Sequence, residues 1–228
     1  MGMNFSICAR MLLCAAALGA GGCAPQRAVA WPATFVARLE ALALLQTLNA
    51  DLLSHDSATL TLEHWCDVHR LASPPRIIAE RVAGLDKTAT LEQRLELGVS
   101  ATESLRYRRV RLRCGGVVLS EADNWYVPAR LTPEMNTLLD TTELPFGKVV
   151  RALQFQRHTV SALVLWSPLP EGWEMNPIAA SQHATKLRVP QKLLEHRAIL
   201  TLRDGMPISE VVETYTGNVL AFPAPGPR

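Results

Sequence analysis

The sequence predicts one α+β domain in which helices precede a largely antiparallel β-sheet. Apolar residues recur at three- and four-residue spacings between Phe35 and Trp65, as they do on the buried face of a helix. Farther along the chain, short runs alternate apolar and polar residues, and turn signals such as Asp204-Gly205 separate them. The chain has 228 residues and 48% apolar content, which is enough for one sizeable core. Helices followed by hairpins are typical of the α+β class.

The N-terminal residues have the order of a secretory signal. Arg10 precedes the apolar run MLLCAAALGAGGC, which is too short to span a bilayer and ends in small residues at Cys23. Because AGGC resembles a bacterial lipoprotein cleavage box, we expect Cys23 to be lipidated in an exported protein anchored to the membrane and facing the periplasm. The alternative is a cytoplasmic protein with a mis-assigned start codon. The expected divisions are a signal peptide (1–23), a tether (24–33), the folded domain (34–223) and a tail (224–228).

The helical part begins with an amphipathic helix of about 18 residues from Phe35. It ends near SHDSAT, where Asp56 or Ser57 can cap a second short helix. LTPEMNTLLDTT predicts a later helix, because Thr132 is a good N-cap and Pro133 suits the first turn. LPFGKVVRAL is expected to be a loop that enters another short helix. The expected strands are RIIAERVAG, Leu105 to Cys114, VVLSEADNWYVP, HTVSALVLWSPL and the two halves of RAILTLRDGMPISEVVETYTG.

Two charged residues are expected to face the interior of the sheet. Strand alternation places Arg108 on the same face as Val110 and Leu112, whereas Arg109 belongs to an outer basic stripe. Since a guanidinium keeps its charge, its burial requires a carboxylate, a bound anion or trapped water. Glu213 shares a face with Val211 in the last strand and is an inward carboxylate if that face is the inner one. Arg108 and Glu213 then either neutralise each other or bind the two ends of an anionic ligand.

Cys66 and Cys114 are the cysteines outside the leader. They can pair in an oxidising compartment, but the sequence does not show that their Cβ atoms approach, and two buried free thiols are the favoured interpretation. The segment EHWCDVH contains potential metal ligands without a compact tetrahedral spacing, so we predict no metal site. The net charge of +2 and the absence of nucleic-acid-binding motifs give no reason to expect a nucleic acid partner.

Four stretches together resemble the chorismate lyase family, whose fold is shared with the effector domains of some bacterial transcription regulators. LLSHDSAT resembles the family's segment after the first helix. The stretch from YRRVRLRCGG to WYVP resembles its arginine-bearing strand and the following hairpin strand. LLDTTELPFGKVV resembles its helix followed by a P-[LF]-G-[RK] turn, and LRDGMPISEVVETYTGNVL resembles its terminal acidic hairpin. The resemblance extends from about Phe35 to Phe222 and implies a chorismate lyase-like α+β fold, with the sheet and helices packed around a ligand pocket.

The resemblance also implies a site and a reaction. Enzymes of the family eliminate pyruvate from chorismate and leave 4-hydroxybenzoate, with one arginine on the ring carboxylate and one glutamate at the opposite end of the ring. By this resemblance, the arginine corresponds to Arg108 and the glutamate to Glu213. The loops that donate backbone amides to the ligand correspond to Ala58 and Phe146. A gap of one residue would move the arginine role to Arg109. The match to Glu213 needs an adjustment of one residue after Pro207, so Glu210 is a rival for the glutamate role. A lyase acting on chorismate or a related enolpyruvyl aromatic acid is expected, as a monomer that requires no metal or organic cofactor. The alternative is a non-catalytic envelope lipoprotein that binds a small aromatic carboxylate or only retains the fold.

Overall fold

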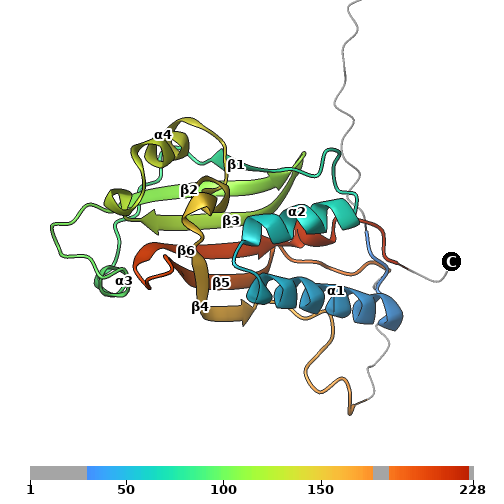
Figure 1. The fold of residues 1–228 in the computed structure, drawn as a ribbon. Helices are drawn as coiled ribbons and strands as arrows, with labels where there is room; N and C mark the ends of the chain where they lie inside the picture. The colour runs from blue at the N-terminus through green and yellow to red at the C-terminus, as the bar shows by residue number, and fades with distance from the viewer. Residues whose placement is uncertain (1–29, 177–184, 226–228) are drawn as a thin grey trace, which may run out of the picture.

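The computed structural model describes residues 30–176 and 185–225 and confirms the α+β class (Figure 1). Six strands form one antiparallel sheet in the order β1-β2-β3-β6-β5-β4. The strands are β1 (Ile77–Arg81), β2 (Arg106–Cys114), β3 (Val117–Tyr126), β4 (Gln156–Val164), β5 (Lys192–Thr201) and β6 (Pro207–Thr216). The helices are α1 (Phe35–Ser54), α2 (Ala58–Val68), α3 (Leu91–Glu96), α4 (Pro133–Thr141) and α5 (Phe146–Val149).

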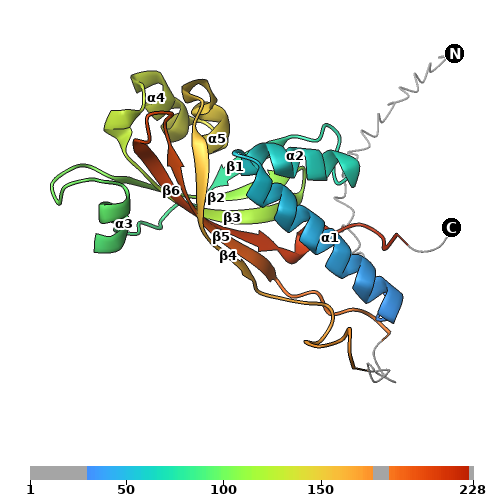
Figure 2. The same ribbon diagram turned by 60° about the horizontal axis from the view of Figure 1, so that its bottom comes forward.

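The helices α1, α2, α4 and α5 cover the inner face of the sheet in two groups (Figure 2). The main core lies where α1 and α2 pack on the central strands, through residues such as Leu48 and Leu62. A second apolar cluster, which includes Tyr126 and Leu139, lies under α4 and α5. The segment around α3 packs near Trp125 on the opposite face. Residues of α2 and α5 line a cavity on the inner face.

Most helices begin where the sequence places an N-cap. The hydroxyl of Thr34 accepts from the backbone N–H of Ala37, and Ser57 and Thr132 cap α2 and α4 in the same way. The sequence analysis did not predict α3, because a six-residue helix has too few residues to show an apolar period. Its one local signal is the capping box between Thr90 and Gln93.

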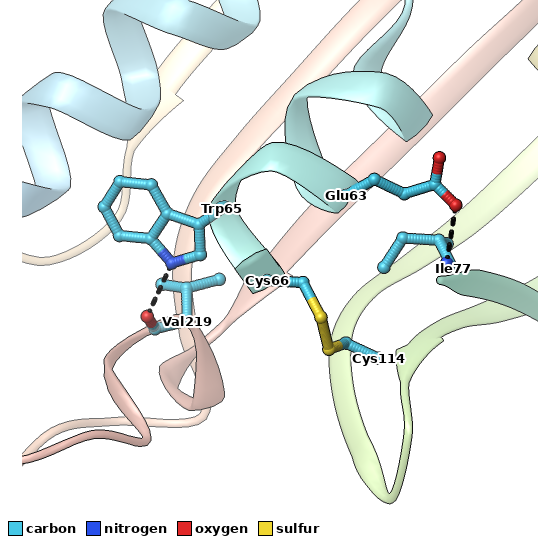
Figure 3. The surroundings of a disulfide bond; sticks show 6 residues. All are labelled: Glu63, Trp65, Cys66, Ile77, Cys114 and Val219. Carbon is cyan, nitrogen blue, oxygen red and sulfur yellow. Dashed lines mark hydrogen bonds between the residues drawn. A yellow bond between two sulfur atoms is a disulfide. The ribbon is translucent and has the colours of Figure 1, made fainter. Parts of the chain in front are cut away.

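The preference for free thiols at Cys66 and Cys114 is wrong, because the two residues form a disulfide (Figure 3). It joins α2 to the end of β2 across a Cα–Cα distance of 6.2 Å. Two neighbouring contacts also fix α2. The Trp65 indole N–H donates to the Val219 carbonyl at 2.9 Å, and the Glu63 carboxylate accepts from the Ile77 N–H at 2.8 Å. The helix is therefore held to the sheet by covalent and polar contacts.

The folded part begins earlier than expected, since the sequence assigns Trp31 to a tether although its side chain is buried. The indole N–H of Trp31 donates to the Leu220 carbonyl at 3.0 Å, and Pro32 forms an isolated bridge with Lys186. Trp31 is therefore part of the core. The expected signal peptide, including Cys23, lies outside the described residues. Within residues 30–176 and 185–225, no helix is long and apolar enough to cross a membrane.

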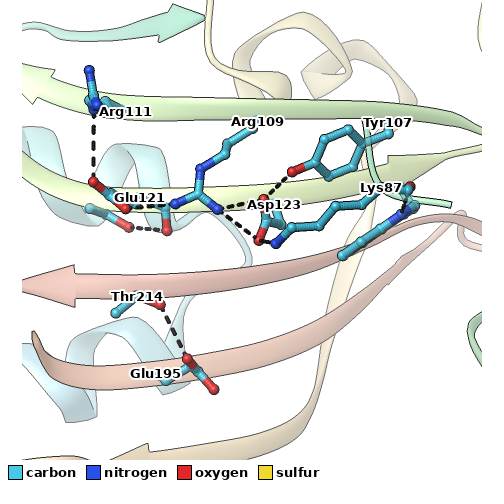
Figure 4. A network of polar contacts seen from close by, with 10 residues as sticks. Lys87, Tyr107, Arg109, Arg111, Glu121, Asp123, Glu195 and Thr214 are labelled. Carbon is cyan, nitrogen blue, oxygen red and sulfur yellow. Dashed lines mark hydrogen bonds and ion pairs between the residues drawn. The ribbon is translucent and has the colours of Figure 1, made fainter. Parts of the chain in front are cut away.

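The basic stripe of β2 lies on the outer face and is balanced by acidic residues of β3 (Figure 4). Arg109 donates to Glu121 at 2.8 Å and to Asp123 at 3.0 Å, and Lys87 also pairs with Asp123. Cross-strand pairs of this kind stabilise neighbouring strands. These contacts place Arg109 on the face opposite to Arg108.

Candidate ligand-binding site

A cavity, which we call the central cavity, lies on the inner face of the sheet between α2 and α5. It has about 520 Å³ of space free of protein atoms, part of which is open to solvent. Its apolar lining comprises Ala58, Val110, Leu112, Ala122, Pro145, Phe146, Gly147, Phe155, Leu200 and Val211. Its polar lining comprises Asp56, Ser57, Thr59, Arg108, Asn124, Arg157 and Glu213. Apolar walls with a few convergent polar groups are typical of sites for small organic ligands.

Arg108 brings a buried and unpaired charge to this cavity. Arg108 is buried, with 4% of its surface exposed. One guanidinium nitrogen, Nη2, donates to the carbonyls of Leu144 at 3.1 Å and Thr142 at 3.4 Å. Among the described residues its Nε atom has no hydrogen-bond partner, and no carboxylate lies within ion-pair distance of it. Burial, reinforced by the charge of Arg81, lowers the pKa of Arg108 to about 10.

Glu213 is also buried, but it already has a cationic partner. Its Oε2 atom accepts from Nη2 of Arg157 at 2.7 Å and from the Tyr215 hydroxyl at 3.2 Å. Burial is the largest single influence on Arg157 and disfavours its charge, but the charge and hydrogen bond of Glu213 together with Tyr215 and Asp56 outweigh it, so the pKa of Arg157 is raised. Arg108 and Glu213 therefore do not neutralise each other. Arg157 is not predicted from the sequence, because it precedes the apolar run that indicates the fourth strand.

The two sequence-predicted charges lie at separate positions around the cavity. The register pairs Arg108 with Asn124 and Asn124 with Val211, whereas Glu213 pairs with Ala122 in the adjacent inward row. Glu213 is thus two strands and two residues away from Arg108. With ordinary strand spacings, this corresponds to a Cα separation of about 12 Å.

Ala58 and Phe146 supply opposite walls of the same cavity. Ala58 is the first residue of α2, after the N-cap Ser57, so its N–H has no acceptor within the helix. Phe146 follows Pro145 at the start of the short helix α5. Gly147 keeps the space between these walls open, because a Cβ atom there would lie 3.4 Å from the Ser57 hydroxyl oxygen. All four residues inferred from the resemblance therefore border one cavity.

The two rival positions lie elsewhere. Arg109 is on the outer face, in the ion pairs with Glu121 and Asp123. Glu210 is fully buried on that same side of the sheet, where it accepts from Arg197 at 2.8 Å and from Gln93 at 3.1 Å. Neither residue lines the central cavity.

A buried group of polar residues lies behind Glu213. His196 is fully buried, its Nε2 lies 2.8 Å from the Asn49 side-chain oxygen, and its ring meets that of Tyr215 edge-on at 5.3 Å. Burial, together with the charge of Arg157, lowers the pKa of His196. Burial and the charge of Glu213 raise the pKa of Tyr215 well above its usual value. Both rings are therefore neutral at pH 7, and the ion pair here joins Arg157 to Glu213.

No protein-family model matches the chain. A close relative is the protein named "Uncharacterized protein y4mC" of Sinorhizobium fredii (strain NBRC 101917 / NGR234), with 57% identity over 196 residues. The aligned part covers 86% of this chain and 83% of y4mC. The chain belongs to the y4mC family. At 57% identity, this y4mC-family chain and its relative are expected to share one fold.

Several solved structures are similar to this y4mC-family chain at low identity. PhnF from Mycobacterium smegmatis has a TM-score of 0.47 and 17% identity, covering 75% of this chain and 68% of PhnF. The effector domain of PhnF from Mycobacterium smegmatis has a TM-score of 0.43 and 18% identity, and the match covers 66% of this chain and 88% of that domain. A GntR-family transcriptional regulator from Enterococcus faecalis V583 has a TM-score of 0.40 and 11% identity, and the match covers 62% of this chain and 95% of the regulator.

Proposed function

We propose that the central cavity binds a small aromatic carboxylate of the 4-hydroxybenzoate type. The observation that carries this proposal is the buried guanidinium of Arg108, which lines the cavity and has no carboxylate partner within the described residues. A ligand carboxylate would supply the missing charge and accept from the unpartnered N–H groups in a charge-assisted hydrogen bond. The apolar lining would cover the two faces of an aromatic ring.

The end of the central cavity that Glu213 and Arg157 line is suited to a hydroxyl group on the ring. Glu213 offers carboxylate oxygens, and the Nε–H of Arg157 has no acceptor among the residues that the structure describes. A phenolic hydroxyl can donate to a carboxylate and accept from a guanidinium at the same time. A ring with a carboxylate at one end and a hydroxyl at the other would satisfy both ends of the cavity.

The second candidate is a lyase that eliminates pyruvate from chorismate or a related enolpyruvyl aromatic acid. It is supported by the resemblance to the chorismate lyase family and by the position of Glu213 in the same cavity as Arg108. Loss of pyruvate makes the ring aromatic, so the protein would mainly orient the substrate, exclude water and stabilise the charge that develops on the leaving group. This reaction requires no metal or organic cofactor.

The test is a titration of the purified chain with 4-hydroxybenzoate, followed by calorimetry and by the shift in melting temperature. Saturable binding that Arg108→Met weakens by about 100-fold would support the site, because a charged hydrogen-bonded pair contributes on the order of 3 kcal/mol. Arg109→Met removes the same charge from the neighbouring residue on the outer face and is the matched control. Equal affinity of the two variants would refute the site.

The same preparations distinguish binding from catalysis. Incubation with chorismate should release 4-hydroxybenzoate and pyruvate in equal amounts if the protein is a lyase, and Glu213→Gln should abolish that release. Binding of 4-hydroxybenzoate without turnover of chorismate would leave the binding function and refute the lyase.

We also propose that the protein is exported and anchored through a lipid on Cys23. The disulfide between Cys66 and Cys114 supports this location, because structural disulfides form and persist in oxidising compartments such as the bacterial periplasm.

A further inference from the structure

A second cavity lies on the other side of Arg108, and we call it the arginine cavity. It has about 640 Å³ of space free of protein atoms, part of it open to solvent. Its lining comprises Arg81, Leu85, Asp86, Leu105, Arg106, Tyr107, Arg108, Tyr126, Leu139 and Asp140. Arg108 therefore borders both cavities.

Strand register explains why three arginines meet there. Arg81 at the end of β1 pairs with Val110, and Arg106 at the start of β2 pairs with Tyr126. Side chains of directly paired residues lie on the same face, and residues two apart in one strand share it as well. Arg81, Arg106 and Arg108 therefore all extend from the inner face, next to the end of α4.

Three arginines and two aspartates, Asp86 and Asp140, line the arginine cavity, so its cationic groups outnumber its carboxylates. Arg106 forms an ion pair with the carboxylate of Asp140, and Arg81 donates to the backbone carbonyl of the same residue. Neither Arg81 nor Arg108 has a carboxylate partner in the described part of the chain. The two guanidinium groups are close enough for the charge of Arg81 to disfavour the charged form of Arg108.

We propose that the arginine cavity binds an oxyanion, a carboxylate or phosphate group, between Arg81 and Arg108. An anion at this position would replace the repulsion between the two cations by two attractions. When no carboxylate occupies the central cavity, the anion would also accept from the buried Nε–H of Arg108, which has no partner among the described residues. Tyr126 also lines the arginine cavity, and a phenolic hydroxyl can donate to an anion.

The anion can come from two sources with the same chemistry. A separate small anion would occupy the arginine cavity independently of the proposed function. A second acidic group on the ligand of the central cavity would also reach it, because Arg108 separates the two cavities, and this source rests on the proposed function.

The first arm of the test titrates the protein with inorganic phosphate at constant ionic strength in chloride. Saturable binding is expected, and Arg81→Gln should weaken it by about tenfold through loss of a charged hydrogen-bond donor. Arg76→Gln is the matched control, since Arg76 is an exposed arginine just before the other end of β1 and lies outside both cavities. Its affinity for phosphate should equal that of the wild type.

The second arm compares 4-hydroxybenzoate with 4-hydroxyphthalate, which carries an additional carboxylate beside the first. A preference for the dicarboxylate that Arg81→Gln removes, without phosphate binding, would identify the second acidic group as the source. If Arg81→Gln changes neither the phosphate affinity nor the preference for 4-hydroxyphthalate, the proposal is overturned. Binding of 4-hydroxybenzoate would in that case still support the central cavity, so failures of the two proposals are distinguishable.

Discussion

The Arg108 side chain keeps its charge in the interior at a cost to folding. Because a depression of the pKa by one unit corresponds to about 1.4 kcal/mol, the fall from 12.5 to about 10 destabilises the folded state by on the order of 3 kcal/mol at pH 7. Hydrogen bonds to the carbonyls of Thr142 and Leu144 offset part of this cost. A residue that weakens the fold and lines a cavity fits a binding role better than a structural one.

Replacing Arg108 with methionine should therefore remove ligand binding without destabilising the protein. We expect the free energy of unfolding of Arg108→Met to rise by about 1 kcal/mol, since loss of the buried charge outweighs loss of the two hydrogen bonds. Urea unfolding of the two proteins without ligand measures the difference. A decrease of more than about 1 kcal/mol would show that Arg108 is mainly a structural residue.

His196 should make the stability depend on pH below the usual pKa of histidine. Burial and the charge of Arg157 lower its folded pKa below 6.5, so below pH 6.5 the unfolded state binds more protons than the folded state. The free energy of unfolding should then fall with decreasing pH, from about 6.5 until the folded pKa is passed. The slope attributable to one histidine is at most about 1.4 kcal/mol per pH unit.

A comparison with His196→Gln isolates this contribution, because glutamine can still hydrogen-bond Asn49 but does not titrate. Denaturant unfolding between pH 7 and 5 should give a steeper slope for the wild type than for the variant. Parallel curves would show that another group causes the pH dependence.

At the scale of elements, strand alternation was sufficient to place the charges that face the cavity. The inward positions of Arg108 and Glu213 follow from the period of two in β2 and β6, and the structure places both on one face. Arg157 could not be predicted in the same way, since β4 begins at Gln156 while the apolar run begins only after His158. Its role as the partner of Glu213 depends on a contact between strands far apart in the sequence.

The short helix α5 should control the size of the central cavity. A Cβ atom at Gly147 would lie 3.4 Å from the Ser57 hydroxyl oxygen and 3.6 Å from the Phe155 ring, which is ordinary contact. Gly147→Ala is therefore expected to keep or slightly raise stability, by about 0.5 kcal/mol, because alanine restricts the unfolded chain. The added methyl group occupies space in the cavity lining.

Affinity for 4-hydroxybenzoate should consequently fall in Gly147→Ala by about tenfold, and further in Gly147→Val, as steric overlap with the ring grows. Calorimetric titration of both variants, together with their melting temperatures, measures the effect. Unchanged affinity in two folded variants would place the ligand elsewhere.

At the scale of the whole molecule, the fold class and the order of most elements were predictable, whereas the disulfide was not. Pairing of Cys66 with Cys114 requires the packing of α2 against the end of β2, which only the folded chain specifies. Trp31 was misassigned for a similar reason. Its neighbours Pro32 and Ala33 have the composition of a tether, but the indole finds its acceptor at Leu220, at the other end of the chain.

The expected lipid anchor predicts where the protein is found in a bacterial cell. Cys23→Ser should transfer the protein from the membrane fraction to the soluble fraction, because stable attachment would depend on acyl chains on that cysteine. Cell fractionation and the mass of the mature N-terminus measure this change. Retention of Cys23→Ser in the membrane fraction would contradict lipid anchoring at this residue.

The disulfide should stabilise the whole domain and, through it, the central cavity. It links positions 48 residues apart, and such a loop corresponds to up to about 4 kcal/mol from restriction of the unfolded chain. The double variant Cys66→Ala/Cys114→Ala should therefore lose about 2 to 4 kcal/mol in denaturant unfolding.

Its affinity for 4-hydroxybenzoate should also decrease, because the disulfide joins the helix that carries Ala58 to the strand that carries Arg108. A reductant should lower the stability of the wild type toward that of the double variant and leave the double variant unchanged. Two more titratable thiols in the unfolded, untreated wild type than in the double variant, with no response to reductant, would contradict the disulfide. A loss of stability without any change in affinity would instead show that the contacts of Trp65 and Glu63 are sufficient to hold α2 at the cavity.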